Sequence, residues 1–581
     1  MSVFKQKNSI ASVEFKKFKG IDTRAPLGES GAAYDMVNFR VLPDGSLQKR
    51  CGFKAIASYN AKIRGVWSGT LGETTAIFAV YGSTVVKILP KEGRTTVIGK
   101  TSSSEGDVNF MFHNERLYLC DGQTFYIVTE SNVAAAEGYV PLYGKDWPVR
   151  YKGEVNEPLN LASRHIRMTY IVTEELSFLC VDHVISEIDA VYINGELITD
   201  KSRYYFDEPA MCVSVKGLKL NDRVELFLTV SESETNIAEI FSCKNSVVYG
   251  DYADSILFLW NGNKKNIMFA SSSVSEQSLE ESRFMYPNSA PFYVPAGSTF
   301  KIPKENQQIT GVCRQYDRLL IFTKEDTWMG NISSSSPKRT LEAVTVNPSY
   351  GCTSVGAAVV CENSPVCVSD GAIIRWTSET DELNECNQYS ISSKIESMLS
   401  PSFFENAVVL IDKRQSEIFF ADSTDNQGIL WIYNYKIDSW YKFDGITVKS
   451  MFLHENSLGF IYLNTVYLFN DSICYDELKG GSVRNITATF ESYPSDLSVG
   501  GNKKRLCGMT LNANLSGGEI HTQYFSEGEC ISKTLLESDN AFPKSFMRRL
   551  NSKRFSYVTL RILSTARAKQ RIYSTGIWAK P

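Results

Sequence analysis

The sequence predicts an all-β protein, with a β-propeller-like core, an inserted β-sandwich and a C-terminal β-sandwich. Three observations lead to this fold class: aromatic residues make up 12% of the chain, short apolar segments are bounded by turn residues, and helical periodicity is scarce. Aromatic and β-branched residues favour strands, and the 38 glycines favour tight turns. A chain of 581 residues is long enough for about three to four domains.

The propeller prediction depends on a shared layout, in which an apolar strand, a tight turn and a second apolar strand follow one another. Asp121-Gly122 and Asp370-Gly371 are dipeptides typical of hairpin turns. In the last four units the apolar centres recur at intervals of about 40–50 residues, the period of four-stranded propeller blades. One blade cannot cover both of its faces, and radial stacking buries them. The segments are Thr75–Leu89, Asn114–Val128, Asp254–Trp260, Asp317–Met329, Ser364–Trp376, Glu417–Ala421, Ile429–Phe443 and Ser457–Phe469.

Two changes in this pattern divide the chain further. The interval from Val128 to Asp254 is too long for one blade, and the Asn-Gly turn of Tyr192–Glu196 indicates a hairpin within it. We therefore expect residues 1–155 to hold an N-terminal arm and the first blades, 156–243 an inserted β-sandwich, and 244–480 the remaining blades. A break at Gly480–Ser482 then opens a C-terminal β-sandwich at 481–581.

Two segments carry more specific expectations. Ser392–Ser400 is a candidate for a short helix. In Ile429–Phe443, alternate residues place Ile429, Trp431, Tyr433 and Tyr435 on one face of a strand. That face is expected to be blade core, although part of it could instead meet a neighbouring subunit.

Charge and composition exclude several classes of protein. Lys and Arg number 61 against 65 Asp and Glu, which gives a net charge of −4 and a pI near 6.0. A basic nucleic-acid reader would be expected to have a domain pI above about 9. No segment approaches the ~18 consecutive apolar residues of a membrane helix, and no secretory signal is expected at the start of the sequence. The 13 cysteines are scattered and never spaced as C-x-x-C, and the five histidines are dispersed, so neither a metal nor a cofactor is expected.

Known catalytic motifs fail on spacing. Gly93–Thr101 resembles a P-loop but has five residues between its glycines, where the phosphate cradle needs four, and a strand-turn-strand surrounds it. No Gly-x-Ser-x-Gly elbow is present. Ser369–Trp376 is similar to the Asp box of sialidases, but its Ser–Asp spacing is wrong and Arg375 replaces the Thr. No catalytic residue is therefore assigned, and the chain is not expected to be an enzyme.

The C-terminal segment carries three short basic runs. They form a candidate docking surface for an acidic neighbour: Lys503, Lys504, Arg505, Arg548, Arg549, Lys553 and Arg554.

One stretch, Phe18–Phe53, resembles an opening found in structural proteins of tailed bacteriophages. There a Gly-hydrophobic-Asp/Asn-x-Arg turn precedes Pro-Leu, small residues lead to an Asn-hydrophobic strand, and a hairpin ends in Gly-x-Leu-x-Lys-Arg-x-Gly. Family members often have Pro where this chain has Cys51. The matching residues are Gly20, Ile21, Asp22, Arg24, Pro26, Leu27, Gly31, Ala32, Ala33, Asn38, Phe39, Asp44, Gly45, Leu47, Lys49, Arg50 and Gly52.

The resemblance extends to Ser364–Phe443, which is similar to the propeller of tail nozzle, or tail stabilisation, proteins of short-tailed phages. From the residues alone, the N-terminal stretch is structural: Asp44-Gly45 closes a hairpin and Lys49-Arg50 places charge at a strand end. Any β-protein with a two-stranded N-terminal arm would also fit this pattern.

The resemblance implies a virion protein of the phage tail, made in the host cytoplasm, which forms a homo-oligomeric ring, expected to be sixfold. Such a ring would contact neighbouring tail or head-to-tail connector proteins, extend the tail channel, and retain and then pass DNA without reading its sequence. Two alternatives stay open. One is a tail adhesin that binds host glycan or protein through either sandwich, and the other is a propeller glycosidase with acids converging on the axis.

Overall fold

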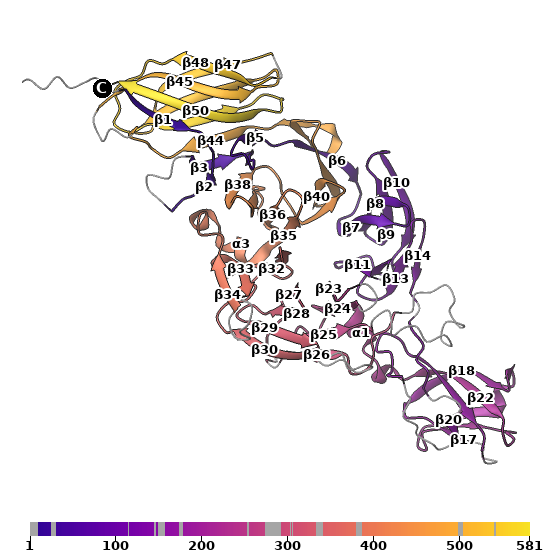
Figure 1. Ribbon diagram of the computed structural model, residues 1–581. Helices are drawn as coiled ribbons and strands as arrows, with labels where there is room; N and C mark the ends of the chain where they lie inside the picture. The colour runs from indigo at the N-terminus through magenta and orange to yellow at the C-terminus, as the bar shows by residue number, and fades with distance from the viewer. Residues whose placement is uncertain are drawn as a thin grey trace, which may run out of the picture. The chain divides into compact units, whose positions relative to one another are not determined.

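The computed structural model describes residues 10–24, 31–113, 115–136, 138–143, 147–148, 157–173, 178–251, 255–272, 292–302, 304, 306–332, 341–378, 386–497, 503–539 and 542–580. Nearly all regular structure in these residues is β-strand (Figure 1). The chain divides into two compact units. The first comprises residues 1–63, 90–93 and 350–581, and the second comprises 64–89 and 94–349.

The second unit contains four four-stranded sheets, the blades, among its described residues. A strand that is buried on both faces is a continuous apolar run rather than an alternating one. Ile256–Trp260, for example, is buried at all five positions. The strands are β7 (Ile63–Leu71), β8 (Thr74–Tyr81), β9 (Thr84–Leu89) and β10 (Arg94–Lys100); β11 (Asn109–His113), β12 (Arg116–Cys120), β13 (Phe125–Val128) and β14 (Val133–Ala135); β23 (Asn245–Tyr249), β24 (Ile256–Trp260), β25 (Ile267–Ala270) and β26 (Thr299–Lys301); β27 (Gly311–Gln315), β28 (Arg318–Phe322), β29 (Thr327–Ile332) and β30 (Leu341–Asn347).

The first unit contains three further blades among its described residues, and the last of them joins distant parts of the chain. Strand β6 (Gly52–Ser58) pairs with β41, so that Phe53 lies opposite Phe469. Beyond β6 the same sheet continues through two short strands, β42 (Tyr475–Glu477) and β43 (Val483–Asn485). The other strands are β31 (Ala358–Cys361), β32 (Ser364–Ser369), β33 (Ala372–Ser378) and β34 (Cys386–Ser390); β35 (Ala407–Asp412), β36 (Glu417–Asp422), β37 (Leu430–Asn434) and β38 (Ser439–Phe443); β39 (Ser450–His454), β40 (Ser457–Tyr462) and β41 (Thr465–Asn470).

The insert forms two sheets around its own apolar core. The larger sheet has the order β15-β16-β22-β18-β19 and the smaller β17-β21-β20. The expected Asn-Gly hairpin is confirmed, with Asn194 at φ 51° and Gly195 at φ 83°. The strands are β15 (Trp147–Pro148), β16 (His165–Ile171), β17 (Phe178–Cys180), β18 (Ile185–Ile193), β19 (Glu196–Leu197), β20 (Tyr204–Asp207), β21 (Cys212–Val215) and β22 (Arg223–Val230).

The C-terminal sandwich incorporates strands from the start of the chain. One sheet has the order β4-β5-β50-β45-β48, with β1 also paired to β50. The other runs β3-β44-β49-β46-β47 and is continuous with the blade of β35–β38 through β2. The strands are β1 (Ala11–Phe15), β2 (Gly20–Ile21), β3 (Ala32–Val37), β4 (Phe39–Val41), β5 (Leu47–Lys49), β44 (Ala488–Ser492), β45 (Arg505–Asn514), β46 (Glu519–Ser526), β47 (Glu529–Glu537), β48 (Lys544–Arg549), β49 (Thr559–Ser564) and β50 (Arg571–Lys580).

The structure confirms the predicted fold class and corrects one element. Ser392–Ser400 holds only a 3-10 turn, and Ser400 instead caps an α-helix that begins at Pro401, with its side chain accepting from the Phe403 N–H. Gly93–Thr101 lies in the β9–β10 hairpin. The described helices are α1 (Ile237–Phe241), α3 (Pro401–Asn406) and the 3-10 turns Lys201–Arg203, Glu232–Glu234, Glu396–Met398 and Lys479–Gly481.

The described residues contain neither a membrane-spanning helix nor a cluster of metal-binding side chains. No helix there has the length and apolar character that a membrane crossing requires. Nor do three or more His, Cys, Asp or Glu side chains gather anywhere in those residues in a way that could hold a metal ion.

Candidate functional site

The resemblance motif forms a buried polar cluster, which we call the N-terminal lock and define as Asn38, Lys49, Arg50 and Gly52. Arg50 donates two hydrogen bonds to Asp476 on β42, at 2.8 and 2.9 Å, and both side chains are buried. Bidentate Arg–carboxylate pairs of this kind are among the strong hydrogen-bonded pairs in proteins. Lys49 does end strand β5, but both charged side chains of Lys49-Arg50 are enclosed rather than presented at the surface.

Asn38 connects the lock to two other elements. Its amide donates to Asp444 Oδ1 (2.6 Å), which follows β38, and to Thr487 O (2.7 Å), which precedes β44. Its side-chain oxygen accepts from Arg50 Nε at 2.8 Å. The backbone of Asn38 has φ 58°, a left-handed conformation that Asn tolerates better than most residues. One side chain thus links a blade to the C-terminal sandwich.

Lys49 and Gly52 complete the lock. Burial lowers the pKa of the Lys49 amine to about 8, and the amine donates to Ala566 O at 2.6 Å and to Ser564 Oγ at 3.2 Å. A Cβ on Gly52 would lie 1.7 Å from the Tyr475 carbonyl oxygen, so only glycine lets β6 and β42 approach so closely. The lock residues therefore hold the arm, the last blade and the sandwich together. The motif's Pro26 and Leu27 lie outside the described residues.

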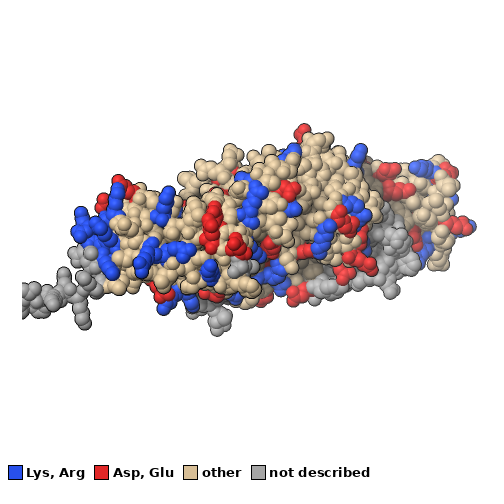
Figure 2. All heavy atoms as spheres, turned by 90° about the horizontal axis from the view of Figure 1, so that it is seen from above, with Lys and Arg blue, Asp and Glu red and all other residues tan. Residues whose placement is uncertain are grey.

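The structure brings the predicted docking residues together at one end of the C-terminal sandwich. Lys504 and Phe555 exchange backbone hydrogen bonds of 2.9 Å, and β45 pairs with β48 so that Gly508 lies opposite Arg549. The basic runs at 503–505, 548–549 and 553–554 are therefore neighbours in space. Figure 2 shows Lys and Arg gathered over this sandwich, at the left of the view.

Two of the seven predicted residues have other roles. Lys504 is only 2% exposed, and its amine donates to Asp496 O at 2.6 Å, so it cannot present its charge to a partner. Lys553 forms an exposed ion pair with Glu529 at 2.9 Å. The remaining five are exposed, and we call them the basic surface: Lys503, Arg505, Arg548, Arg549 and Arg554.

One exposed apolar side chain accompanies the basic surface. Met547, next to Arg548 on the last strand of its sheet, is 68% exposed, whereas Phe542, 78% exposed, precedes the opposite end of that strand. An apolar side chain among basic ones can contribute to a protein interface, whereas phosphate binding is dominated by charge. The sequence did not single out Met547, because β48, with the sequence KSFMRR, lacks the apolar alternation of a strand. The combination suits a protein partner with acidic groups.

Charge is divided unevenly along the chain. Residues 481–581 hold 15 Lys and Arg against 7 Asp and Glu, a net charge of +8, and residues 1–63 add +6. Residues 64–480 carry −18. Of the N-terminal charge, residues 10–24 and 31–51 carry +3. Because β1, β3, β4 and β5 belong to the C-terminal sandwich, this positive charge adds to that of the C-terminal segment in one domain. The overall charge of −4 hides this division.

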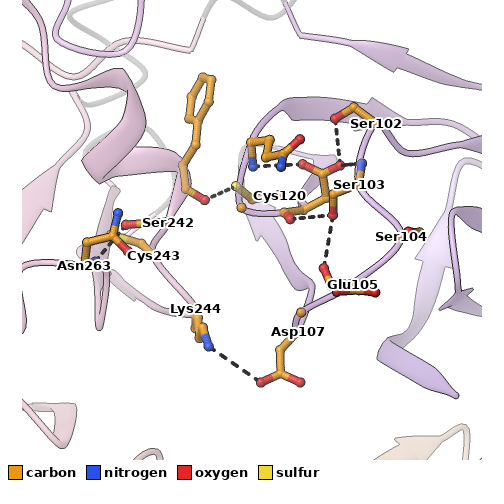
Figure 3. Close-up of a pocket in the computed structure, with 15 residues that line it drawn as sticks. Ser102, Ser103, Ser104, Glu105, Asp107, Cys120, Ser242, Cys243, Lys244 and Asn263 are labelled. Carbon is orange, nitrogen blue, oxygen red and sulfur yellow. Dashed lines mark hydrogen bonds and ion pairs between the residues drawn. The ribbon is translucent and has the colours of Figure 1, made fainter.

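A polar cavity of about 530 Å³ lies in the second unit (Figure 3). The loop at 102–107 forms one side, and Arg64 holds that loop by donating to three of its carbonyl oxygens at 2.6–2.8 Å. Burial opposes ionisation of Asp121, but N–H donors that include Ser103 (2.8 Å) hold the pKa of its carboxyl below the usual range. These groups are engaged in shaping the loop.

The Cys120 thiol of this cavity is held in its protonated form. Burial raises the pKa of the Cys120 thiol to about 12, and Cys120 donates to Phe241 O at 2.7 Å. A protonated thiol is a poor nucleophile. Lys244 Nζ lies 3.8 Å from Asp107 Oδ2, which makes a weak surface pair (Figure 3). The Cys120 thiol is therefore not an activated nucleophile.

The aromatic segment Ile429–Phe443 contributes to blade core, as expected. Strand β37 is buried at every position, and the Tyr433 and Trp440 rings stack with centroids 4.9 Å apart. Trp440 Nε1 donates to Ile391 O at 2.7 Å, which satisfies its buried N–H.

Comparison with known proteins gives no assignment. No family model and no curated protein matches the chain. Solved structures that resemble it include the extracellular domain of a one-component system from B. thetaiotaomicron, at 10% identity and a TM-score of 0.25, covering 91% of this chain and 82% of that one. A glycoside hydrolase family 43 arabinoxylan arabinofuranohydrolase from Bacillus subtilis, in complex with cellotetraose, matches at 10% identity and a TM-score of 0.20, covering 57% of this chain and 78% of that one.

Proposed function

We propose that the chain is a structural subunit of a bacteriophage tail, which closes into a ring with copies of itself and extends the tail channel. In this role it contacts neighbouring tail or connector proteins, and DNA passes through the ring without sequence recognition. The proposal gives the chain a mechanical task and no catalytic one. Its mechanism is the repeated use of one head-to-tail interface, which closes a ring when the rotation between copies is right.

The N-terminal lock is the observation that carries this proposal. The residues that resemble the opening of phage tail proteins are used within the chain itself, where Arg50, Asn38 and Lys49 bond to elements more than 400 positions away. A motif with this role specifies an architecture. The structural role of the lock supports the idea that the motif resembles that of tail proteins because the two share an architecture.

The division of charge supports assembly. The positive sandwich has a candidate complement in the −18 carried by residues 64–480 of another copy. Complementary charge of this kind raises the rate of association and selects the partner. The exposed Met547 beside the basic surface would supply an apolar contact that charge alone lacks.

A labelling experiment on virions tests the location. Gold-labelled antibody against the purified chain should decorate the tail of virions from a phage that encodes it, and the chain should be present there in several copies per particle. Absence of the chain from purified virions would overturn the proposal. A label at the capsid surface alone would also overturn it.

A further inference from the structure

The larger sheet of the insert carries a cleft on the face turned away from the insert's core. The cleft has a volume of about 350 Å³. This value is at the lower end of the range for small-molecule pockets, which are about 300–1,000 Å³. The side chains that line it include Val140, His165, Asp189, Ala190, Tyr192 and Phe227.

Phe227 occupies a position that a polar residue would normally take. Alternate residues of β22 are buried in the core, and Phe227 lies on the opposite, half-exposed face. The ring lies opposite Ala190 on β18, and Tyr192 packs edge-on against it with ring centroids 5.6 Å apart. The small Ala190 leaves room above these two rings.

A neighbouring cation holds the Phe227 ring in place. Arg167, opposite Phe227 on β16, lies with its guanidinium carbon 5.8 Å from the ring centroid. The same guanidinium pairs with Glu225 at 3.4 Å. Arg167 is therefore neutralised within the sheet and adds no open positive charge to the cleft.

Irregular pairing of β18 brings polar groups to the same cleft. The register of β18 against β22 shifts between Ile188 and Ala190, so Asp189 is an extra residue that does not follow the alternation. Its carboxylate accepts from Thr229 Oγ1 at 2.9 Å and lies 3.3 Å from His165 Nδ1. Bulges of this kind often re-aim a side chain beside a functional site.

Asp189 and His165 keep hydrogen-bonding capacity. A carboxylate has about four lone-pair sites, and the two oxygens that share the Thr229 hydroxyl leave others open. His165 uses Nδ1 toward Asp189 and Thr229, which leaves Nε2 for a hydroxyl group. A hydroxyl both donates and accepts, so it can pair with Nε2 in either tautomer.

The charge of the insert restricts the class of ligand. Residues 156–243 hold 7 Lys and Arg against 15 Asp and Glu, a net charge of −8. Anionic ligands such as phosphates and acidic sugars are disfavoured near such a surface. An uncharged ligand with one apolar face and several hydroxyls fits the two rings, the carboxylate and the imidazole together.

We propose that this cleft binds one neutral pyranose ring of a polysaccharide. The apolar face of the sugar packs on Phe227 and Tyr192, and its hydroxyls pair with the Asp189 carboxylate and with His165 Nε2. The site is independent of the assembly role, because none of its residues belongs to the lock or to the basic surface. Binding of this sugar would give the chain a second function, recognition of a polysaccharide by the insert.

Saturation-transfer NMR on the full chain tests the site. The probes are the methyl glycosides of glucose, galactose, mannose and N-acetylglucosamine, each at about 10 mM, which is tenfold above a Kd of 1 mM. Glucuronic acid serves as the anionic probe. We expect transfer to the ring C–H protons of at least one neutral glycoside and none to glucuronic acid. Transfer to no probe, or transfer to glucuronic acid as strong as that to the neutral probes, would refute the proposal.

Substitutions in the cleft test whether the sugar binds there. Phe227→Ala and Tyr192→Ala should each weaken binding at least tenfold, and Ala190→Trp should abolish it by filling the cleft. Tyr205→Ala is the matched control, because Tyr205 is a 53% exposed tyrosine on the other sheet of the same insert. Wild-type affinity in both Ala190→Trp and Phe227→Ala would show that the sugar binds elsewhere. Virion location and copy number do not affect this result, so the two proposals fail separately.

Discussion

Among the individual residues, the buried pair of Arg50 and Asp476 fastens the N-terminal arm to the last blade. Arg484 adds a further hydrogen bond to the same carboxylate at 2.8 Å. Taking an Arg and an Asp out of water is costly, and the cost is offset only when geometry is good and the remaining polar atoms are bonded. Arg50 meets this condition, since its Nε also donates to Asn38.

Removal of the Asp476 carboxylate should be costly. Asp476→Ala leaves the Arg50 guanidinium buried without a counter-charge, and breaking a buried pair in this way costs about 3–5 kcal/mol. Urea unfolding followed by tryptophan fluorescence measures the change. Lys553→Ala, which breaks the exposed pair with Glu529, is the control and should cost about 0–1 kcal/mol. Equal losses in the two variants would contradict the role given to the lock.

A buried histidine predicts a loss of stability in acid. Burial lowers the pKa of His113, whose Nε2 lies 3.1 Å from Ser255 Oγ. The unfolded chain then binds more protons than the folded one below the ordinary pKa of about 6.5. The stabilising contribution is therefore fully present above that pH, and it is lost as the pH falls from there through the lowered pKa of the folded chain.

His113→Gln should reduce this dependence of stability on pH. Thermal unfolding between pH 7.5 and 5 should show a shallower fall in Tm for the variant than for the wild type. Some dependence should remain, because burial also lowers the pKa of His454. An unchanged slope would mean that His113 is not held neutral by the fold.

The residues of the lock were only partly predictable. Their spacing indicated a structural segment, but not that its charges would be enclosed. Arg50 finds its carboxylate on Asp476, 426 positions along the chain. A partner at that distance leaves no local pattern, so the burial of Arg50 could not be foreseen.

Among the strands, blade hairpins were predictable and their long-range partners were not. Apolar runs separated by turns with Gly, Asp or Asn located β12–β13, β32–β33 and β40–β41, because each hairpin is local. The pairing of β6 with β41 has no such signal. The helix expected at 392–400 is displaced because Ser400 and Pro401, a cap and a first-turn proline, set its start.

A disulfide can test the pairing of β6 with β41. Ser58 lies opposite Thr465, with the two hydroxyl oxygens 3.0 Å apart. Ser58→Cys/Thr465→Cys should form a disulfide across a very long loop, which the chain-entropy model values at about 6 kcal/mol. Mass spectrometry of linked peptides detects the bond.

The control for this disulfide changes the register by one residue. In Ala57→Cys/Thr465→Cys the two side chains point to opposite faces of the sheet, so no bond should form. Equal yields from both pairs would show that β6 and β41 do not hold the described register.

The sequence of one strand in the insert contains a signal for the cleft. The segment Arg223–Val230 alternates strictly, and its outward positions are polar except Phe227. Phe227 breaks the polar pattern of this face, and an aromatic side chain there can form part of a binding surface. The bulge that presents Asp189 could not be foreseen, since it depends on the register with β22.

For the molecule as a whole, the proposed assembly uses the separation of charge along the chain. Composition indicated a near-neutral chain and excluded a basic nucleic-acid reader. Only the structure shows that the two chain ends share one sandwich, which concentrates the positive charge. We infer that copies of the chain associate through this sandwich.

Charge reversal should weaken that association. Arg505→Glu, Arg549→Glu and Arg554→Glu together convert the basic surface to an acidic one, and like charges across an interface oppose binding. The control reverses three exposed lysines of the insert, which changes the net charge by the same amount. Assembly should be lost in the basic-surface variant and kept in the insert variant. The control substitutions are Lys201→Glu, Lys216→Glu and Lys219→Glu.

Mass measurement of the purified wild-type chain at low and high salt tests whether copies assemble through attraction between oppositely charged surfaces. We predict closed multiples of 65.1 kDa at low salt, with six copies at about 390 kDa, and smaller species as screening increases. A single species at 65.1 kDa at every salt and protein concentration would show that the chain does not assemble in this way.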